Sequence, residues 1–245
     1  KDQPGVLFQQ TSDGKFISTN QPLFLADAFC EDVNALFFDA DGDGDKDLYV
    51  VSGGNQLQTN DSSLLDRLYL NDGKGNFTKS NWLPQIFGNK SVAIAADIDH
   101  DGDLDLFIGA GGNNNPPYSR QMQHRLFKND GKGNFSLDAS AFPNNDMDIA
   151  VATAYDFDHD GDLDLFVGGR NEPRNYGVSP SSHSYGNDGK GHFTDIAKTK
   201  NSDIANIGMV TDATWADVTG DGYKEGSICV EDISPKLCKY DEKEL

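Results

Sequence analysis

A nine-residue pattern of alternating acidic residues recurs along the chain, and it constrains the fold more than any other feature. The pattern reads Asp-x-Asp-x-Asp-Gly-x-x-Asp, starts at Asp39, Asp97 and Asp156, and returns in a weaker form at Asp217. These starts lie 58, 59 and 61 residues apart. A fixed period of this length is typical of repeat proteins, in which each period forms one structural unit.

Each copy carries the oxygen ligands that calcium prefers. Closely spaced carboxylates repel one another unless a cation neutralises them, and calcium takes six to eight oxygen ligands from loops that offer side chains at positions 1, 3 and 5. Glycine at position 6 permits a sharp turn, and position 9 adds a further carboxylate. The candidate ligands at positions 1, 3, 5 and 9 are Asp39, Asp41, Asp43 and Asp47; Asp97, Asp99, Asp101 and Asp105; Asp156, Asp158, Asp160 and Asp164; and Asp217, Thr219, Asp221 and Glu225. The alternative is an acidic surface loop without a metal, and it is strongest for the fourth copy, where Thr219 removes one charge.

Strands, not helices, flank these loops. An EF-hand needs a Glu at position 12 and a helix on each side, whereas position 12 is Val50, Ile108 or Val167. Short apolar runs precede and follow the loops at 35–38 and 48–51, and at equivalent places in the later copies. Such runs, bounded by Gly and Asp, indicate strands. Each loop is therefore expected to join two antiparallel strands.

A second repeated element completes the unit. Asn-Asp-Gly recurs at 71–73, 129–131 and 187–189, and a shortened copy lies at 12–16. Between β-like runs this tripeptide is a strong hairpin signal, because its residues tolerate the positive φ of tight turns. Each repeat of about 60 residues then holds four antiparallel strands, which describes the blade of a β-propeller. The sequence predicts an all-β fold of about four such blades.

These motifs resemble the FG-GAP/VCBS repeats of integrin α-subunit heads, and most closely their bacterial and cartilage-acidic-protein relatives, which are often followed by an ASPIC/UnbV region. The resemblance covers about residues 5–225. It implies a β-propeller, usually of seven blades, with Ca²⁺ in the loops between the first two strands. It also implies that the carbonyls of Asp45, Asp103, Asp162 and Tyr223 at position 7 are ligands, in three calcium sites and a weaker fourth.

The repeats end before the chain does. Residues 1–225 are expected to form the propeller repeats, and residues 226–245 a divergent, charged tail of open origin that contains Cys229 and Cys238, a candidate disulfide pair. Four repeats are fewer than the family fold usually has. Two arrangements remain open: a slice of a larger propeller, which we favour, or a closed four-bladed ring in which residues 6–18 complete the blade that begins at 209–230.

The charge balance restricts the partners and the location. A net charge of −20, with 40 acidic residues, disfavours nucleic acid and anionic membranes as partners. No stretch is long enough to span a bilayer, and the chain starts without Met or a signal segment, so any signal peptide has been removed or the chain starts internally. Extracellular modules bind calcium at about 10⁻⁴–10⁻³ M, so such sites fill only where calcium is abundant. We expect an extracellular, cell-surface or periplasmic protein.

The expected function is adhesion or recognition of a protein or glycan ligand, without catalysis. No His-Glu-x-x-His, Gly-x-Ser-x-Gly or phosphate-loop motif occurs. The connections between the second and third strands vary where the scaffold does not, which suits a ligand face. Candidate contact residues there are Tyr118, Arg120, Arg170, Arg174 and Tyr176. Solvated connectors are the alternative for this face. Other possible functions are the propeller part of a secreted polysaccharide-active enzyme and a structural segment of a larger surface protein; the ligand identity and oligomeric state stay open.

Overall fold

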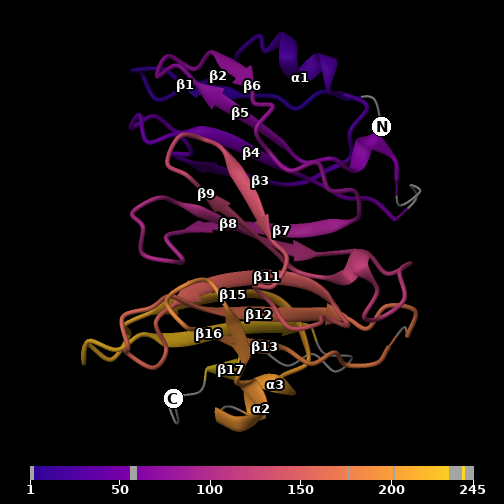
Figure 1. The fold of residues 1–245 in the computed structure, drawn as a ribbon. Helices are drawn as coiled ribbons and strands as arrows, with labels where there is room; N and C mark the ends of the chain where they lie inside the picture. Colours follow the sequence, from indigo (N-terminus) through magenta and orange to yellow (C-terminus); the bar gives the residue numbers. More distant parts are fainter. Residues whose placement is uncertain (1–2, 56–59, 176, 201, 232–238, 241–245) are drawn as a thin grey trace.

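The structure, a computed structural model, describes residues 3–55, 60–175, 177–200, 202–231 and 239–240. The described residues form antiparallel sheets that are stacked in chain order, with the two ends of the chain at opposite ends of the stack (Figure 1). The predicted all-β fold is confirmed.

Three of the sheets have four strands each and match the predicted blades. Neighbouring strands in each sheet are also neighbours in the sequence, so every connection within a sheet is of the hairpin type. The first sheet consists of β3 (Asp32–Phe38), β4 (Asp47–Ser52), β5 (Arg67–Asn71) and β6 (Phe77–Lys79). The second consists of β7 (Lys90–Ala96), β8 (Asp105–Ala110), β9 (Arg125–Asn129) and β10 (Phe135–Asp138). The third consists of β11 (Asp148–Tyr155), β12 (Asp164–Asn171), β13 (His183–Asn187) and β14 (Phe193–Asp195). We refer to these sheets as blades 1, 2 and 3.

A fourth, three-stranded sheet follows as blade 4. It consists of β15 (Met209–Ala216), β16 (Glu225–Glu231) and β17 (Lys239–Tyr240). β16 starts at the predicted domain boundary of residue 225 and pairs along its length with β15. Residues 226–231 therefore form a strand of this blade. Cys238 lies outside the described residues, so a Cys229–Cys238 disulfide stays a prediction.

The apolar core lies between the blades. Successive side chains of a strand point to opposite faces, and β8 uses both of its faces. Leu106 and Ile108 belong to the cluster shared with blade 1, which includes Tyr49. Phe107 belongs to the cluster shared with blade 3, which includes Tyr185. The second strands of blades 1 and 2 are consequently buried along their whole length.

The N-terminal segment packs on blade 1 and decides between the two predicted arrangements. It forms the hairpin β1 (Phe8–Gln10) and β2 (Phe16–Ser18), followed by the short helix α1 (Pro22–Ala26). Phe24 of α1 packs on Tyr69 of blade 1. The hairpin thus lies at the opposite end of the stack from blade 4 (Figure 1). In the described residues the blades form an open partial propeller. The alternative prediction, in which the N-terminal hairpin completes the last blade and closes a four-bladed ring, was wrong.

Short helical turns occupy the connections. They are the 3₁₀ turns η1 (Ser62–Leu64) and η2 (Arg120–Met122) and the helices α2 (Ala197–Lys200) and α3 (Ser202–Ala205). In the described part of the chain, no helix has the length and apolar character needed to cross a membrane.

Candidate metal centres

All four acidic loops adopt one backbone conformation. The glycine at position 6 has a positive φ in every copy, as the sequence predicted, with values between 91° and 98° for Gly44, Gly102, Gly161 and Gly222. Position 4 also has a positive φ, between 60° and 77°, for Gly42, His100, His159 and Gly220. The second requirement was not predicted. Two histidines adopt there a conformation that glycine adopts more readily.

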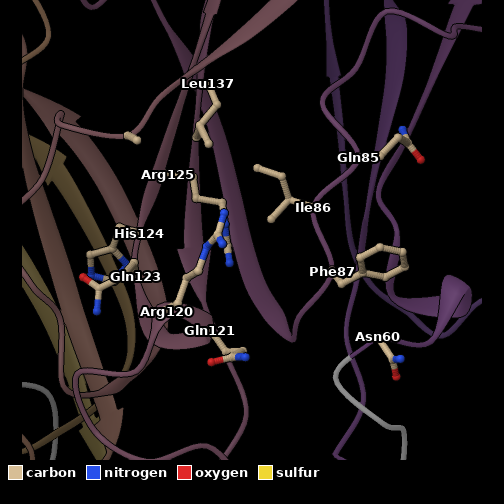
Figure 2. Close-up of a pocket in the computed structure, with 11 residues that line it drawn as sticks. Asn60, Gln85, Ile86, Phe87, Arg120, Gln121, Gln123, His124, Arg125 and Leu137 are labelled. Atoms are coloured by element: carbon tan, nitrogen blue, oxygen red, sulfur yellow. The ribbon is translucent and has the colours of Figure 1, made fainter.

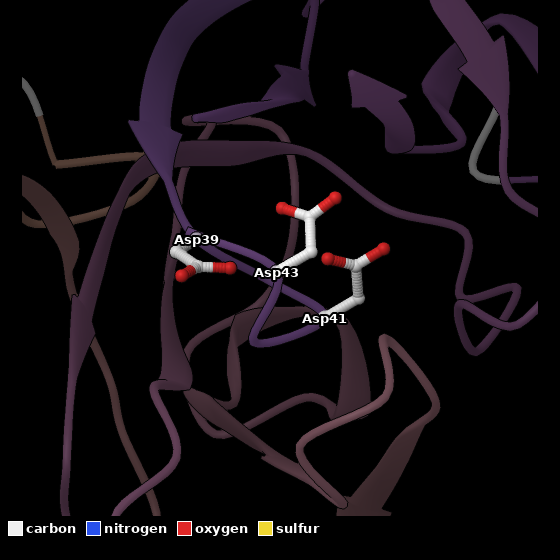
Figure 3. Close-up of side chains that lie close together, drawn as sticks. All are labelled: Asp39, Asp41 and Asp43. Carbon is white, nitrogen blue, oxygen red and sulfur yellow. The ribbon is translucent and has the colours of Figure 1, made fainter. Parts of the chain in front are cut away.

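The acidic side chains converge within each loop. In the first loop, Asp39, Asp41 and Asp43 each bring one carboxylate oxygen within 4.8 Å of the other two (Figure 3). The same limit holds for Asp97, Asp99 and Asp101; for Asp156, Asp158 and Asp164; and for Asp217, Asp221 and Glu225. The structure therefore brings three predicted ligands together in every loop, including the weaker fourth one.

Several of these oxygens are buried without a hydrogen-bond partner. They are Oδ1 of Asp41, Asp97, Asp99 and Asp156. A buried polar atom without a partner costs about 1–3 kcal/mol. Burial and the neighbouring charge of Asp43 also raise the pKa of Asp41. A cation bound among the carboxylates would satisfy the free oxygens and offset the repulsion, so these residues fit a hard cation such as Ca²⁺.

Position 9 connects each of the first three loops to the Asn-Asp-Gly turn of its own blade. Both oxygens of the buried Asp47 accept backbone N–H groups, from Ala40 and Asn71, each at 2.8 Å. Asp164 accepts from Phe157 and Asn187, each at 2.9 Å. This carboxylate therefore braces the loop, and in the third and fourth loops it also belongs to the acidic cluster.

Burial strongly affects the titration of position 9. It raises the pKa of Asp105 to about 7, against the hydrogen bond from Asn129 and together with the charges of Asp99 and Asp101. It raises the pKa of Asp164 to about 6 in the same way. Burial therefore penalises the charged form of these carboxylates, and a bound cation would offset that cost.

The side chains at position 7 point to the turn. A Cβ atom on Gly73 would lie 2.3 Å from Asp45 Oδ2, and one on Gly131 would lie 2.4 Å from Asp103 Oδ2. Asp162 lies equally close to Gly189. The turn glycine is therefore required because a carboxylate lies against it. A ligand role for the carbonyls at position 7 stays a prediction.

The turn asparagine joins neighbouring blades. Asn129 Nδ2 of blade 2 donates to the carbonyl of Ala40 in the first loop at 2.8 Å, and also to its own loop at Leu104. Asn187 of blade 3 repeats this with Ile98 of the second loop, at 2.8 Å. The two asparagines are thus interblade contacts that the hairpin signal alone did not reveal.

The fourth loop closes through its threonine. Thr219 Oγ1 donates to Glu225 Oε1 at 3.0 Å, and the N–H of Val218 donates to Glu225 Oε2 at 2.8 Å. Thr219 therefore orients the carboxylate at position 9 where the other loops have an aspartate.

The predicted ligand face contains contacts between connections of successive blades. Arg174 of blade 3 donates through Nε and Nη2 to the carbonyl of Asn114 in blade 2, at 3.1 and 2.8 Å. Asn114 in turn donates to the carbonyl of Asn55 in blade 1. Tyr118 is 61% exposed, and its hydroxyl donates to Asp146 at 2.6 Å. The three connections therefore form one continuous surface.

The remaining candidates of this face differ in their surroundings. Arg120 is exposed at the start of η2. Arg170 forms an ion pair with Glu231 of blade 4. Tyr176 lies outside the described residues. Arg170 is thus committed to an interblade contact, whereas Arg120 is available to a ligand.

The comparisons with known proteins agree with this architecture. Residues 39–108 and 112–167 match the family model described as an FG-GAP-like repeat. A comparison with curated proteins finds none that matches the chain. The family match extends over half of the chain and covers the first three acidic loops. The chain therefore belongs to the FG-GAP-like repeat family.

Proposed function

We propose that the chain is an extracellular, calcium-binding propeller module that recognises a ligand without catalysis. The single observation that carries the calcium part is the set of buried, unpartnered carboxylate oxygens within the acidic clusters. Hydrogen bonds from the protein do not satisfy these oxygens, and a divalent cation would.

The extracellular location follows from the affinity expected of such loops. Sites with a Kd of about 10⁻⁴–10⁻³ M gain about 0.4–1.4 kcal/mol each at roughly 1 mM calcium. In a compartment with little calcium, the clustered carboxylates would instead repel one another within a chain of net charge −20. Calcium is thus proposed to hold the loops, and through Asn129 and Asn187 the interblade contacts.

The recognition part is supported by the connected surface opposite these loops. Its connections are joined from blade to blade through Asn55, Asn114 and Arg174. A rigid surface with an exposed tyrosine and arginine suits a protein or glycan ligand. Tyr118 and Arg120 are the proposed contact residues.

Thermal unfolding with calcium and with a chelator tests the calcium part. We expect one cooperative transition that moves to lower temperature on chelation, and isothermal titration that reports three or four bound ions. An unfolding temperature that does not change with the chelator would contradict the calcium proposal.

A glycan and matrix-protein array, run on wild type and on Tyr118→Ala, tests the recognition part. Trp82→Ala is the matched control, because Trp82 is also an exposed aromatic residue, with 67% of its surface exposed.

A further inference from the structure

A cavity of about 590 Å³ lies between blades 1 and 2. Blade 2 contributes Arg120, Arg125 and Leu137, whereas the connection between the blades contributes Ile86 and Phe87 (Figure 2). Arg125 is the first residue of β9, and the last residue of that strand, Asn129, contacts the second acidic loop. The cavity therefore lies at the end of the blades away from the metal centres.

Two guanidinium groups meet in this cavity. Arg125 is 6% exposed, and its Nη1 is buried without a hydrogen-bond partner. The side chains of Arg120 and Arg125 point toward one another (Figure 2). Burial lowers the pKa of Arg125, Asp66 and Tyr49 oppose this, and the like charge of Arg120 adds to the lowering. Among the described residues that line the cavity, none is acidic.

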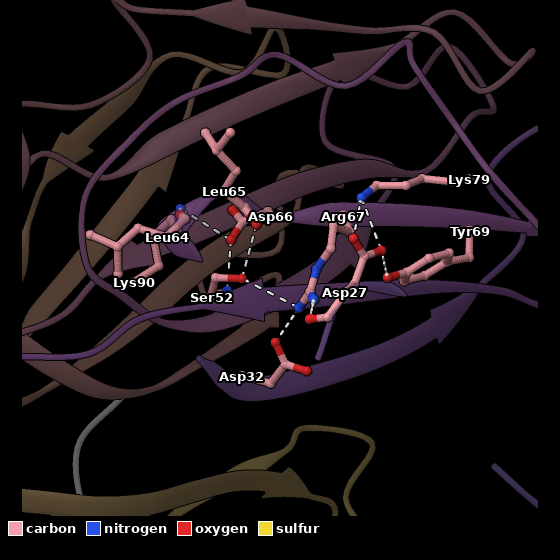
Figure 4. A network of polar contacts seen from close by, with 10 residues as sticks. All are labelled: Asp27, Asp32, Ser52, Leu64, Leu65, Asp66, Arg67, Tyr69, Lys79 and Lys90. Atoms are coloured by element: carbon pink, nitrogen blue, oxygen red, sulfur yellow. Dashed lines mark hydrogen bonds and ion pairs between the residues drawn. The ribbon is translucent and has the colours of Figure 1, made fainter. Parts of the chain in front are cut away.

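The residues equivalent to Arg125 in the neighbouring blades do have acidic partners. Arg67 begins β5 as Arg125 begins β9, and it forms an ion pair with Asp32 at the start of β3 (Figure 4). His183 begins β13 and lies 2.7 Å from Asp195. Blades 1 and 3 therefore supply an acid for the residue at this position.

Blade 2 has replaced that acid. The position of Asp32, at the start of the first strand, is occupied by Lys90 in blade 2. Lys90 turns to blade 1 and pairs with Asp66 at 3.1 Å (Figure 4). Asp66 also accepts the Tyr49 hydroxyl and the Ser52 N–H, each at 2.8 Å. Its two oxygens are thus engaged elsewhere.

The residues that line the cavity indicate which class of anion could pair with Arg125 in place of the missing acid. A carboxylate matches the planar fork of a guanidinium. Side-chain amides of Asn60, Gln85 and Gln121 line the cavity and can bind hydroxyl groups, whereas the amide of Gln123 is bonded to Ser119 and Asn145. Phe87 offers an apolar surface, being 41% exposed. The volume lies in the range of small-molecule sites.

We propose that this cavity binds the carboxylate of an acidic sugar residue through Arg125 and Arg120, with its hydroxyls on the amides and its ring against Phe87. The proposal rests on the recognition function proposed above and names its ligand class. The site uses neither the acidic loops nor Tyr118 and shares only Arg120 with the recognition surface proposed above, so Tyr118→Ala tests that surface and Arg125→Gln tests the cavity separately.

The test is isothermal titration of the full, calcium-loaded chain with glucuronate, with glucose and with acetate. We expect saturable binding of glucuronate, none of glucose, and at least about tenfold weaker binding of acetate, which lacks the hydroxyls. Arg125→Gln and Arg120→Gln should each weaken glucuronate binding by about tenfold or more. Gln121→Glu supplies an internal carboxylate and should also weaken it.

Lys132→Gln is the matched control, because it removes one exposed positive charge from the Asn-Asp-Gly turn of the same blade. Lys132→Gln should bind glucuronate as the wild type does. Any calcium that glucuronate chelates would affect the two proteins equally, so this effect cancels in the comparison. Arg120 is exposed, so Arg120→Gln remains informative if Arg125→Gln does not fold. Absence of saturable glucuronate binding, or equal binding by Arg120→Gln and wild type, would overturn the proposal. Equal affinity for acetate and glucuronate would contradict the proposal that the cavity recognises the sugar ring and its hydroxyls. Calcium-dependent unfolding of the same samples reports the metal function separately.

Discussion

The imidazole Nε2 of His100 lies 2.8 Å from Oδ1 of Asp162. His100 is position 4 of the second acidic loop, and Asp162 is position 7 of the third. The same pair of positions meets one blade further on, where the ring centroids of His159 and Tyr223 are 4.7 Å apart. Side chains at position 4 therefore bridge successive loops, although their φ near 60° is unfavourable for a residue with a Cβ.

The bridge predicts a difference between two substitutions of His100. His100→Ala loses the contact and keeps the unfavourable backbone conformation, so we expect a loss of about 1 kcal/mol in the free energy of unfolding. His100→Gly loses the same contact but relieves the backbone, and should be the more stable of the two variants. Urea denaturation in calcium measures both. An alanine variant as stable as the glycine variant would show that the strain is unimportant.

Removing a single ligand should weaken one calcium site. Asp99 lies at position 3 of the second loop, with Oδ1 buried and unpartnered. Asp99→Asn should lower the number of ions bound at 1 mM calcium by one and reduce the stabilisation by calcium by about 1 kcal/mol. Asp203→Asn removes the same charge from the exposed helix α3 and should leave both quantities unchanged. Loss of one ion in the control as well would mean that net charge, not ligation, governs binding.

The repeat, the strands and the acidic clusters were predictable because they follow from patterns within a few residues. The period located the blades, and glycine at position 6 located the turn of each loop. The polar contacts that join blades were not predictable, since Asn129 and Ala40 are 89 residues apart. The one sequence feature that indicates these contacts is the repeated asparagine of the Asn-Asp-Gly turn. Its role in the hairpin already accounted for the repetition, so nothing pointed to a second role between blades.

Two further features depend on arrangement in space. Whether residues 6–18 close a ring depends on which end of the stack the N-terminal hairpin packs against, and no local pattern encodes this. Arg125 and Arg67 occupy the same place in the repeat, each followed by Leu and an aromatic residue, although His124 precedes Arg125 where Asp66 precedes Arg67. Only the structure shows that Lys90 occupies the place of the acid and turns to Asp66.

The interblade hydrogen bonds predict that equivalent asparagines differ in importance. Asn129 Nδ2 donates both to the loop of blade 1 and to its own loop. Asn71 Nδ2 donates to its own loop alone, at Lys46. Asn129→Ala should therefore destabilise the chain by about 1–3 kcal/mol more than Asn71→Ala does. Thermal unfolding of the two variants measures this, and equal losses would show that the bond to Ala40 contributes nothing.

The raised pKa values predict that protons and calcium substitute for one another. Without calcium, the folded state binds a proton at Asp105 below about pH 7 and at Asp164 below about pH 6, whereas the unfolded chain binds them only near pH 4. Stability of the chelated protein should then fall as pH rises through this window, because the folded state binds more protons than the unfolded state.

Buried His124 opposes this trend, since burial lowers its pKa to about 3 and the unfolded chain alone gains its proton below about pH 6.5. His124 lies away from the acidic loops, so its effect cancels when calcium-loaded and chelated samples are compared at each pH. We therefore expect the rise in unfolding temperature caused by calcium to be larger at pH 7.5 than at pH 5.5. Asp105→Asn should reduce this difference, because it removes the carboxylate with the most raised pKa. A gain from calcium that is equal at both pH values would show that the buried carboxylates do not take up protons in this range.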